Sequence, residues 1–365
     1  MTDGTNTTTY TYDAMNRVLS ATIGANVQAW TYDNNGNRLT TVIAGTTTYA
    51  AFNAANELCN SSTTPGGTCA VPKPGATTYT YNGAGDLTAA TAGLINAATY
   101  STFDQTASTT TASTTTNDTY SDIASDERTA SGSISFVNGL LGVTARTVSS
   151  VTTSFVRDPF GNLVAMNTAA GSYYYTVDAL GSVILMTDPT GAAGTAGAQY
   201  TYDTWGTITA STGNLSASNP WQYATGYKDL NGLTKLGTRY LDTTTGRFTQ
   251  QDPANQGSNY YAYASDNPIS FNDPSGRCVA GIFGHCHNPV NDFFTNTVPN
   301  HAAAAWHDAI VGAGIGGVGG AVAGCTIGFI FAGPGGCVAA GATLGTDAGV
   351  VGAEIGFLYG LTEGS

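Results

Sequence analysis

The chain has 365 residues, enough for about two domains, and its formal net charge is −13. Only 10% of its residues are charged, against about a quarter in typical soluble domains. The acidic balance disfavours nucleic-acid binding through neutralised phosphates, and the composition suits an extracellular β-repeat better than a cytosolic enzyme. No basic segment followed by an apolar one opens the chain, so no signal peptide is visible in it.

A short unit recurs along the first two thirds of the chain, with two aromatic residues two or three positions apart and then Asp or Asn and a small turn. Its copies begin at Tyr10, Trp30, Tyr49, Tyr79 and Tyr200. The closing Asp or Asn recurs at intervals of 20 residues, in Asp13, Asp33 and Asn53 and again in Asp158 and Asp178. A fixed period of this size marks a repeat architecture.

The residue types of this unit predict a β-hairpin. Alternation such as Tyr10-Thr11-Tyr12 places two rings on one face of a strand, and the Asp or Asn that follows favours a turn. One hairpin is marginal alone, so stacked units should form a long antiparallel sheet. Residues 105–150 are degenerate and rich in Thr and Ser, which fits either polar strands or a loose insertion; we favour strands.

Six cysteines fall into three close pairs. The pairs are Cys59 and Cys69, Cys278 and Cys286, and Cys325 and Cys337. They are either disulfides formed in an oxidising compartment or free buried thiols. The spacing of Cys278, Cys286 and the neighbouring histidines matches no standard zinc pattern, so we predict no metal site and no cofactor.

More specific motifs follow the repeats. They are the segments Tyr173 to Val183, Leu236 to Asp242, Gly246 to Phe248, Gln251 to Pro253, Asn267-Pro268 and Asp273 to Gly276. Together with the repeats, they resemble the RHS or YD-repeat family, which includes the teneurins and the shell-forming component of Tc toxins. The resemblance covers roughly 1–277 and implies a mainly β fold, in which stacked antiparallel hairpins form a curled, partial shell.

The resemblance also implies a division of the chain and a location. We expect a YD-repeat sheet at 1–150, an RHS repeat-associated core at 151–277 and a variable tail at 278–365, after an abrupt change of composition. The chain would be the C-terminal portion of a bacterial, polymorphic-toxin-like protein that is secreted or displayed at the cell surface.

In toxin-type members of the family, paired aspartates act as an aspartyl autoprotease that releases the tail. By resemblance, Asp252 and Asp273 would be that pair, because two close carboxylates can share a proton, and Arg247 would lie nearby. Cleavage would fall at the residues Gly276, Arg277 and Cys278.

This sequence departs from the family pattern of the autoprotease. Asn255 replaces a glycine, the interval to Asp273 is one residue shorter, and Arg277 replaces an apolar residue. We therefore favour a structural role for both Asp-Pro pairs, at the ends of strands, and predict that the bond between Arg277 and Cys278 is not cut efficiently.

The tail, 278–365, contains no Lys and no Arg, which disfavours enzymes that handle phosphate groups. Its glycines recur every fourth residue. One ridge is Gly312, Gly316, Gly320, Gly324 and Gly328, a second is Gly341, Gly345 and Gly349, and a third is Gly352, Gly356 and Gly360. At this spacing they line one side of a helix and let another backbone approach.

We predict a glycine-zipper hairpin with helices at about 303–332 and 337–361. Three interpretations of the tail are open: a membrane-active or membrane-embedded hairpin, which we favour, a hairpin packed on the β-shell, or a flexible segment. Asp347 and Glu354 lie within the second helix and share a face, so in a membrane they would point into a bundle or pore.

Three functions compete at this point. The leading one is a toxin-like shell with a non-enzymatic, membrane-active tail. The alternatives are a structural or cell-surface interaction protein with the tail packed on the shell, and an aspartyl autoprotease. Expected partners are a membrane and a cognate immunity protein, with no nucleic acid and no evident small-molecule substrate.

Overall fold

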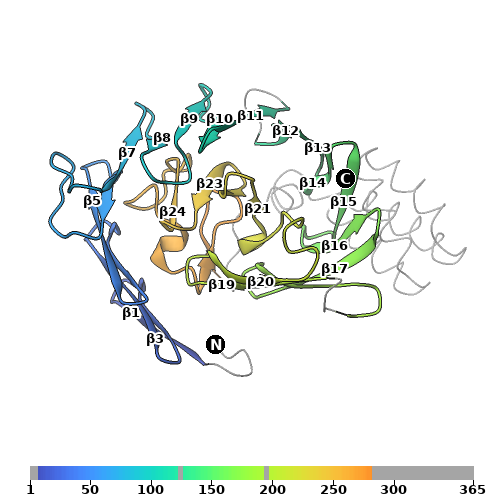
Figure 1. The fold of residues 1–365 in the computed structure, drawn as a ribbon, viewed down its shortest axis with the longest axis horizontal. Helices are drawn as coiled ribbons and strands as arrows, with labels where there is room; N and C mark the ends of the chain where they lie inside the picture. Colours follow the sequence, from blue (N-terminus) through green and yellow to red (C-terminus); the bar gives the residue numbers. More distant parts are fainter. Residues whose placement is uncertain (1–6, 122–125, 193–196, 282–365) are drawn as a thin grey trace, which may run out of the picture. The chain divides into compact units, whose positions relative to one another are not determined.

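The computed structural model describes residues 7–121, 126–192 and 197–281. In these residues the chain folds into antiparallel β-structure, and its helical content is limited to two short 3-10 turns (Figure 1). The prediction of a mainly β, nearly helix-free repeat region is therefore confirmed. The predicted helical hairpin with its glycine ridges lies outside the described residues.

Two large sheets follow chain order, each strand pairing with its neighbours in sequence. The first contains β1 (Thr8–Tyr12), β2 (Val18–Ile23), β3 (Asn26–Tyr32), β4 (Arg38–Ile43), β5 (Thr46–Phe52), β6 (Leu58–Ser62), β7 (Thr77–Tyr81) and β8 (Leu87–Ala90). The second contains β9 (Ala97–Tyr100), β10 (Thr106–Thr111), β11 (Thr114–Tyr120), β12 (Arg128–Ser131), β13 (Ile134–Gly139), β14 (Gly142–Val148), β15 (Val151–Arg157), β16 (Leu163–Thr168), β17 (Gly171–Val177), β18 (Val183–Thr187), β19 (Ala198–Tyr202) and β20 (Ile208–Thr212).

Among the described residues, the end strands of both sheets pair on one side only, so both sheets are open. The Thr- and Ser-rich stretch at 105–150 forms β10 to β14, as we predicted. We expected a domain boundary after residue 150. That position lies in the turn between β14 and β15, and these two strands pair with each other within the second sheet.

Residues 219–281 form a third part, here named the core segment. Its elements are η1 (Tyr223–Thr225), β21 (Tyr227–Lys228), β22 (Thr234–Leu236), β23 (Arg239–Asp242), β24 (Arg247–Phe248), η2 (Ala264–Asp266), β25 (Phe271–Asn272) and β26 (Ala280–Gly281). Strands β21 to β24 form a four-stranded sheet, and β25 and β26 form a pair.

One turn recurs along the repeat, at eight of the reversals of the chain. At Asp33, one carboxylate oxygen accepts hydrogen bonds from the amides of Asn35 and Asn37, both at 2.8 Å. The amide of Asp33 donates to the carbonyl of Asn37, and Gly36 supplies the positive φ of +84° that this turn requires. The same pair of amide bonds forms at Asp13, Asn53, Asn82, Asp158, Asp178, Asp188 and Asp203.

The apolar core lies where the sheets meet the core segment. Leu87, Ile95 and Ala98 pack with Leu233 and Tyr240 of the core segment. A second cluster joins Phe155, Met166 and Val183 of the twelve-stranded sheet to Trp221 and Tyr227. Burying one face of each strand in this way explains the alternation of the repeat, since the other face carries Thr.

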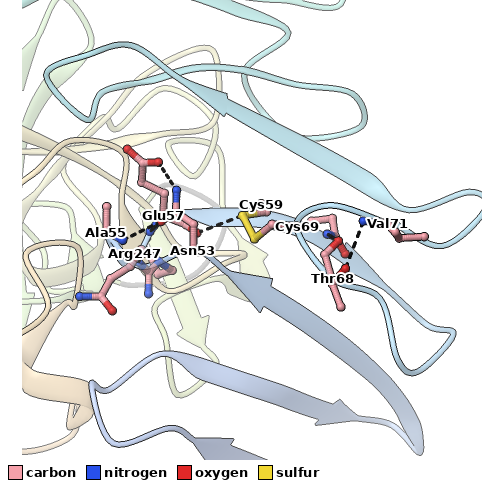
Figure 2. The surroundings of a disulfide bond; sticks show 10 residues. Asn53, Ala55, Glu57, Cys59, Thr68, Cys69, Val71 and Arg247 are labelled. Atoms are coloured by element: carbon pink, nitrogen blue, oxygen red, sulfur yellow. Dashed lines mark hydrogen bonds between the residues drawn. A yellow bond between two sulfur atoms is a disulfide. The ribbon is translucent and has the colours of Figure 1, made fainter.

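Cys59 and Cys69 form a disulfide with a Cα–Cα distance of 5.1 Å (Figure 2). It closes the Pro- and Gly-rich loop after β6, where Thr68 and Val71 also bond each other through their backbones. The other two cysteine pairs include residues outside the described ones.

Candidate functional site

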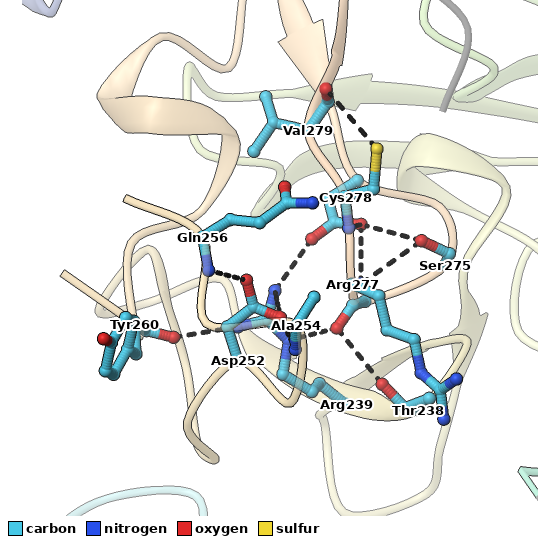
Figure 3. A network of polar contacts seen from close by, with 12 residues as sticks. Thr238, Arg239, Asp252, Ala254, Gln256, Tyr260, Ser275, Arg277, Cys278 and Val279 are labelled. Atoms are coloured by element: carbon cyan, nitrogen blue, oxygen red, sulfur yellow. Dashed lines mark hydrogen bonds and ion pairs between the residues drawn. The ribbon is translucent and has the colours of Figure 1, made fainter. Parts of the chain in front are cut away.

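The two aspartates that the resemblance singled out, Asp252 and Asp273, meet at one arginine, Arg239. The Nη2 atom of Arg239 lies 2.8 Å from Oδ2 of Asp273 and 4.0 Å from Oδ1 of Asp252. All three side chains are buried, and that of Asp273 is fully so. We name these three residues the Arg239 cluster (Figure 3).

Arg239 is placed by β23 and by the segment that follows β25. Its Nη1 donates to the carbonyl of Tyr260 at 2.9 Å, and its Nε donates to the carbonyl of Gly276. Its guanidinium lies 3.6 Å from the ring centroid of Phe248. Each of the three guanidinium nitrogens of Arg239 therefore has an acceptor, and these contacts hold the side chain between the two carboxylates.

Two glycines allow the segments of the cluster to cross. A side chain at Gly237 would begin 2.0 Å from the carbonyl oxygen of Ser275, and one at Gly276 would begin 2.4 Å from that of Leu236. Both glycines have positive φ. The close approach lets the Thr238 amide donate to the Ser275 carbonyl at 3.1 Å.

The carboxylates also hold local backbone. Oδ1 of Asp273 accepts the amides of Arg277 and Cys278 at 3.1 and 3.0 Å. Asp252 accepts the amides of Ala254 and Gln256 at 2.9 and 3.1 Å. Both aspartates therefore stabilise turns after their strands, which is the structural role that we favoured for them.

The peptide bond between Gly276 and Arg277 is held at both ends. Its carbonyl accepts hydrogen bonds from Oγ1 of Thr238, at 3.1 Å, and from Nε of Arg239. Its amide donates to Asp273. Chemically, the donors at the carbonyl polarise it, and a carboxylate lies at the amide side.

Charge and burial oppose each other in this cluster. Burial raises the pKa of the Asp273 carboxyl, and Arg239 acts against that rise. Burial lowers the pKa of Arg239, while the charges of Asp273 and Asp252 act against that change. The ion pair therefore compensates for the removal of all three groups from water.

The arginine at the aspartates is Arg239, and our placement of Arg247 there was wrong. Arg247 donates instead to the side chain of Asn37, at 3.3 Å, and to the carbonyl of Asn56, at 2.6 Å. It lies beside the turn that begins at Asn53 (Figure 2). Proximity along the chain to Asp252 suggested Arg247, but β24 directs its side chain to the eight-stranded sheet.

The sequence contained a signal for Arg239, because Arg239 lies within the motif Leu236 to Asp242. Thr238 belongs to the same motif, and the sequence did not predict that its hydroxyl donates to the carbonyl of Gly276. The predicted cleavage residues Gly276, Arg277 and Cys278 all contact the Arg239 cluster through their backbones.

Comparison with known proteins agrees with the repeat and the motifs. Residues 147–289 match the family model of the teneurin YD-shell. This part of the chain is a YD-shell of the RHS/YD-repeat type. The matched range includes the strands from β15 onward and the Arg239 cluster of the core segment.

Two relatives of the chain have names that describe a nuclease and a toxin. It is 33% identical over 138 residues to the tRNA3(Ser)-specific nuclease WapA of Bacillus spizizenii, which covers 35% of this chain and 6% of that protein. It is 34% identical over 121 residues to the double-stranded DNA deaminase toxin A of Burkholderia cenocepacia, which covers 32% of this chain and 8% of that protein. The matches thus span less than a tenth of either relative.

Solved structures with a similar chain trace come from Tc toxins. The TcdB2-TccC3 complex matches over 74% of this chain and 18% of that one, with 14% identity and a TM-score of 0.40. The Photorhabdus luminescens Tc holotoxin pore matches over 77% and 18%, with 14% identity and a TM-score of 0.39.

Proposed function

We propose that the chain is the C-terminal portion of an RHS-type protein, secreted or displayed at the cell surface, whose partial β-shell carries a non-enzymatic, membrane-active or membrane-embedded tail. The observation that carries the proposal is the change at the end of the core segment. After Arg277 the sequence contains no Lys or Arg and places glycines at every fourth residue, first in an uncharged run from Ala309 to Phe331 and then around Asp347 and Glu354. Such runs suit helices that pack closely in a bilayer.

A vesicle-leakage assay tests this function. We expect the full chain to release dye from lipid vesicles, and the triple change Gly316→Leu, Gly320→Leu and Gly324→Leu to reduce release, because the added side chains hold the helices apart. The double change Asp347→Asn and Glu354→Gln should alter release or its pH dependence if both acids face a wet interior. A chain whose tail is helical but releases no dye at any pH would contradict the membrane function.

The same experiment distinguishes the membrane function from the structural alternative, in which the tail packs on the shell. In that case the triple Leu change should lower the stability of the full chain and leave vesicles intact at every pH. Within the described residues no helix is long and apolar enough to cross a membrane, so the test concerns residues 278–365.

The relatives named as a nuclease and a deaminase act, by those names, on nucleic acid, which stands against our prediction of no nucleic-acid partner. The absence of Lys and Arg from the tail supports that prediction, since phosphate groups are bound mainly by these residues. Incubation with tRNA and with double-stranded DNA tests it. Strand cleavage or base conversion by the purified chain would contradict it. A cognate immunity protein is the partner that a toxin function calls for.

Self-cleavage is a second candidate, favoured by the placement of Asp252 and Asp273 on Arg239. The polarised carbonyl, that of Gly276, lies one bond before the bond between Arg277 and Cys278. We nevertheless expect the chain to stay intact. Both oxygens of Asp273 are already occupied, one by Arg239 and one by two amides, which opposes the shared proton of an aspartate dyad. Intact mass after expression is the measurement. Two fragments that meet near Arg277, and that disappear in Asp273→Asn, would establish cleavage.

A further inference from the structure

Every second turn of the twelve-stranded sheet lies along the same edge. Neighbouring strands of this sheet are antiparallel, so β9, β13, β15, β17 and β19 run in one direction and end at one edge. We name this edge the turn edge; it consists of residues 101–105, 140–141, 158–162, 178–182 and 203–207. Repeats placed before β1 would add strands beside β1, so they would leave the turn edge of β9 to β20 unchanged.

One position in these turns differs in burial along the edge. It is the residue whose amide donates to the side chain of the first turn residue, namely Phe103, Phe160, Leu180 and Trp205. Trp205 is buried, and the carbonyl of Leu180 accepts a hydrogen bond from Asn272 of the core segment. Phe160 and Phe103, by contrast, are 77% and 55% exposed. Among the residues that the structure describes, they are the two most exposed aromatic side chains.

The turn between β13 and β14 adds a third apolar side chain, that of Leu140, which is 44% exposed. The surface beside these turns is open, because a Cβ atom added at Gly142 or Gly161 would meet no atom within 4 Å. Turns are usually built from Gly, Asn, Asp, Pro and Ser, and these exposed side chains bury little of their surface in the described fold. Their gathering on one edge therefore indicates an apolar contact outside the described residues.

The spacing of the three side chains decides which kind of partner fits them. Strands β13 and β15 are two strands apart, and β9 and β13 are four apart. The turns of Leu140 and Phe160 thus lie about 10 Å apart, and those of Phe103 and Leu140 about 19 Å apart. These side chains are separate points along a line. A protein partner would need a matching pocket at each point, whereas a fluid bilayer accepts apolar side chains at any spacing.

We propose that the turn edge binds the surface of a lipid bilayer, with the side chains of Phe103, Leu140 and Phe160 inserted into the boundary between headgroups and acyl chains. Apolar side chains at this depth contribute to binding in proportion to the area that they bury. The contact uses the strand turns alone and does not require residues 278–365 to enter the bilayer.

The charges beside the tips indicate the lipid. Asp104 follows Phe103, and Asp158 lies two residues before Phe160. The nearby Arg157 does not offset them at the surface, because its guanidinium stacks inward on a tryptophan ring, 4.4 Å from the centroid. Anionic headgroups would repel these carboxylates, so the edge suits a zwitterionic lipid such as phosphatidylcholine.

Tryptophan quenching by brominated phosphatidylcholine tests insertion at a single residue. The full chain with Phe160→Trp is compared with the full chain with Val151→Trp. Val151 is 57% exposed and begins the seven-residue strand that leads to the turn of Phe160, so it lies about 20 Å or more from the turn edge. We expect the added fluorescence to be quenched at least about threefold more at position 160, since interfacial side chains lie about 5–10 Å into the headgroup boundary.

Equal quenching at the two positions, or none at position 160, would overturn the proposal. Equal quenching would show that the chain meets the bilayer without a preferred edge. No quenching at position 160 would assign the exposed side chains to a protein partner instead.

Co-sedimentation with phosphatidylcholine vesicles tests the contribution of the same side chain to affinity. Phe160→Ser should weaken the binding of the full chain about tenfold, because one buried phenyl group is lost. Val151→Ser is the matched control and should change binding by less than about twofold. Replacing part of the phosphatidylcholine with phosphatidylserine should also weaken binding. Equal effects of the two serine variants, or stronger binding to phosphatidylserine, would contradict the proposal.

This experiment is independent of the membrane function proposed for residues 278–365. If vesicles release dye but Phe160→Ser binds as tightly as the unchanged chain, the turn-edge contact fails and the function of the tail stands. If binding depends on Phe160 but no dye is released at any pH, the function of the tail fails and the turn-edge contact stands. Circular dichroism of Phe160→Ser and Val151→Ser confirms that both variants are folded.

Discussion

At the scale of single residues, Arg239 makes the cluster possible. It lies between Asp252 and Asp273, and its remaining donors reach the carbonyls of Tyr260 and Gly276. Removing one member of a buried ion pair leaves the others charged without compensation, which costs more than the pair contributes. The stability of the core segment should therefore depend strongly on this one side chain.

We predict that Arg239→Gln lowers the free energy of unfolding by about 3–5 kcal/mol, the range for breaking a buried ion pair. Urea denaturation at neutral pH measures it. Arg277→Gln is the control, because Arg277 pairs with Asp126 at the surface, where the two side chains are 52% and 40% exposed. That change should cost about 0–1 kcal/mol. Equal losses in the two variants would contradict the role given to Arg239.

Asp266 is a second buried residue whose charge matters. Asp266 lies in η2 and is 6% exposed. Its carboxylate lies against Gly36, so that a Cβ atom added at Gly36 would be 2.8 Å from Oδ2 of Asp266. Burial raises the pKa of Asp266 to about 7, although the charges of Arg247, Arg38 and Arg17 act against the rise. The folded protein thus retains a proton that the unfolded chain releases near pH 4.

It follows that the contribution of Asp266 to stability is fully present below about pH 4 and is lost as the pH rises to about 7. Asp266→Asn should remove this dependence. Relative to the unchanged chain, we expect the variant to gain about 2–4 kcal/mol of stability between pH 4 and pH 7.5. Urea denaturation at the two pH values measures it, and Asp86 and Asp273 titrate equally in both proteins. A constant difference between the two proteins would show that Asp266 stays ionised.

At the scale of elements, the repeat depends on its turn. The Asp or Asn accepts two amides in each turn, but the turns differ in burial: Asn37 is buried after Asp33, whereas Thr190 and Ala192 are exposed after Asp188. An amide that loses its acceptor can bond water only where water reaches it. The same substitution should therefore have different effects in two turns of identical pattern.

We predict that Asp33→Ala destabilises the chain by about 1–3 kcal/mol, because a buried amide loses its acceptor. Asp188→Ala should cause a clearly smaller loss, since water replaces the lost bonds. Thermal unfolding of the two variants measures the difference. If both variants behave alike, local backbone preference rather than burial sets the contribution of the turn.

At the scale of the whole described region, long-range contacts join parts that are far apart in sequence. Trp205, in the turn between β19 and β20, packs against Trp30 of the first sheet with ring centroids 6.0 Å apart. The guanidinium of Arg38 lies 4.3 Å from the centroid of the Trp205 ring. On the second sheet, Arg128 bonds both carboxylate oxygens of Asp229. Such contacts make the sheets and the core segment interdependent.

We predict that Trp205→Ala destabilises the described region by about 3–5 kcal/mol, the usual cost of truncating a buried aromatic residue. Phe160→Ala is a matched control, because Phe160 holds the same turn position in another repeat but is 77% exposed, and its loss should stay within about 0.5 kcal/mol. Urea denaturation monitored by circular dichroism measures both. Similar losses would show that Trp205 does not join the sheets.

The β-repeat, its turns and the strands at 105–150 follow from local sequence alone, because alternation and turn residues act over a few positions and need no distant partner. It also indicated Asp252 and Asp273 through their motifs. Which arginine meets them depends on long-range packing, since Arg239 and Arg247 both lie on short strands near the aspartates in sequence. The side chain of Arg239 points into the crossing that Gly237 and Gly276 permit, whereas that of Arg247 reaches Asn37, which is 210 residues away along the chain. No local pattern encodes a pairing over that separation, because it depends on how two sheets and a later segment pack together.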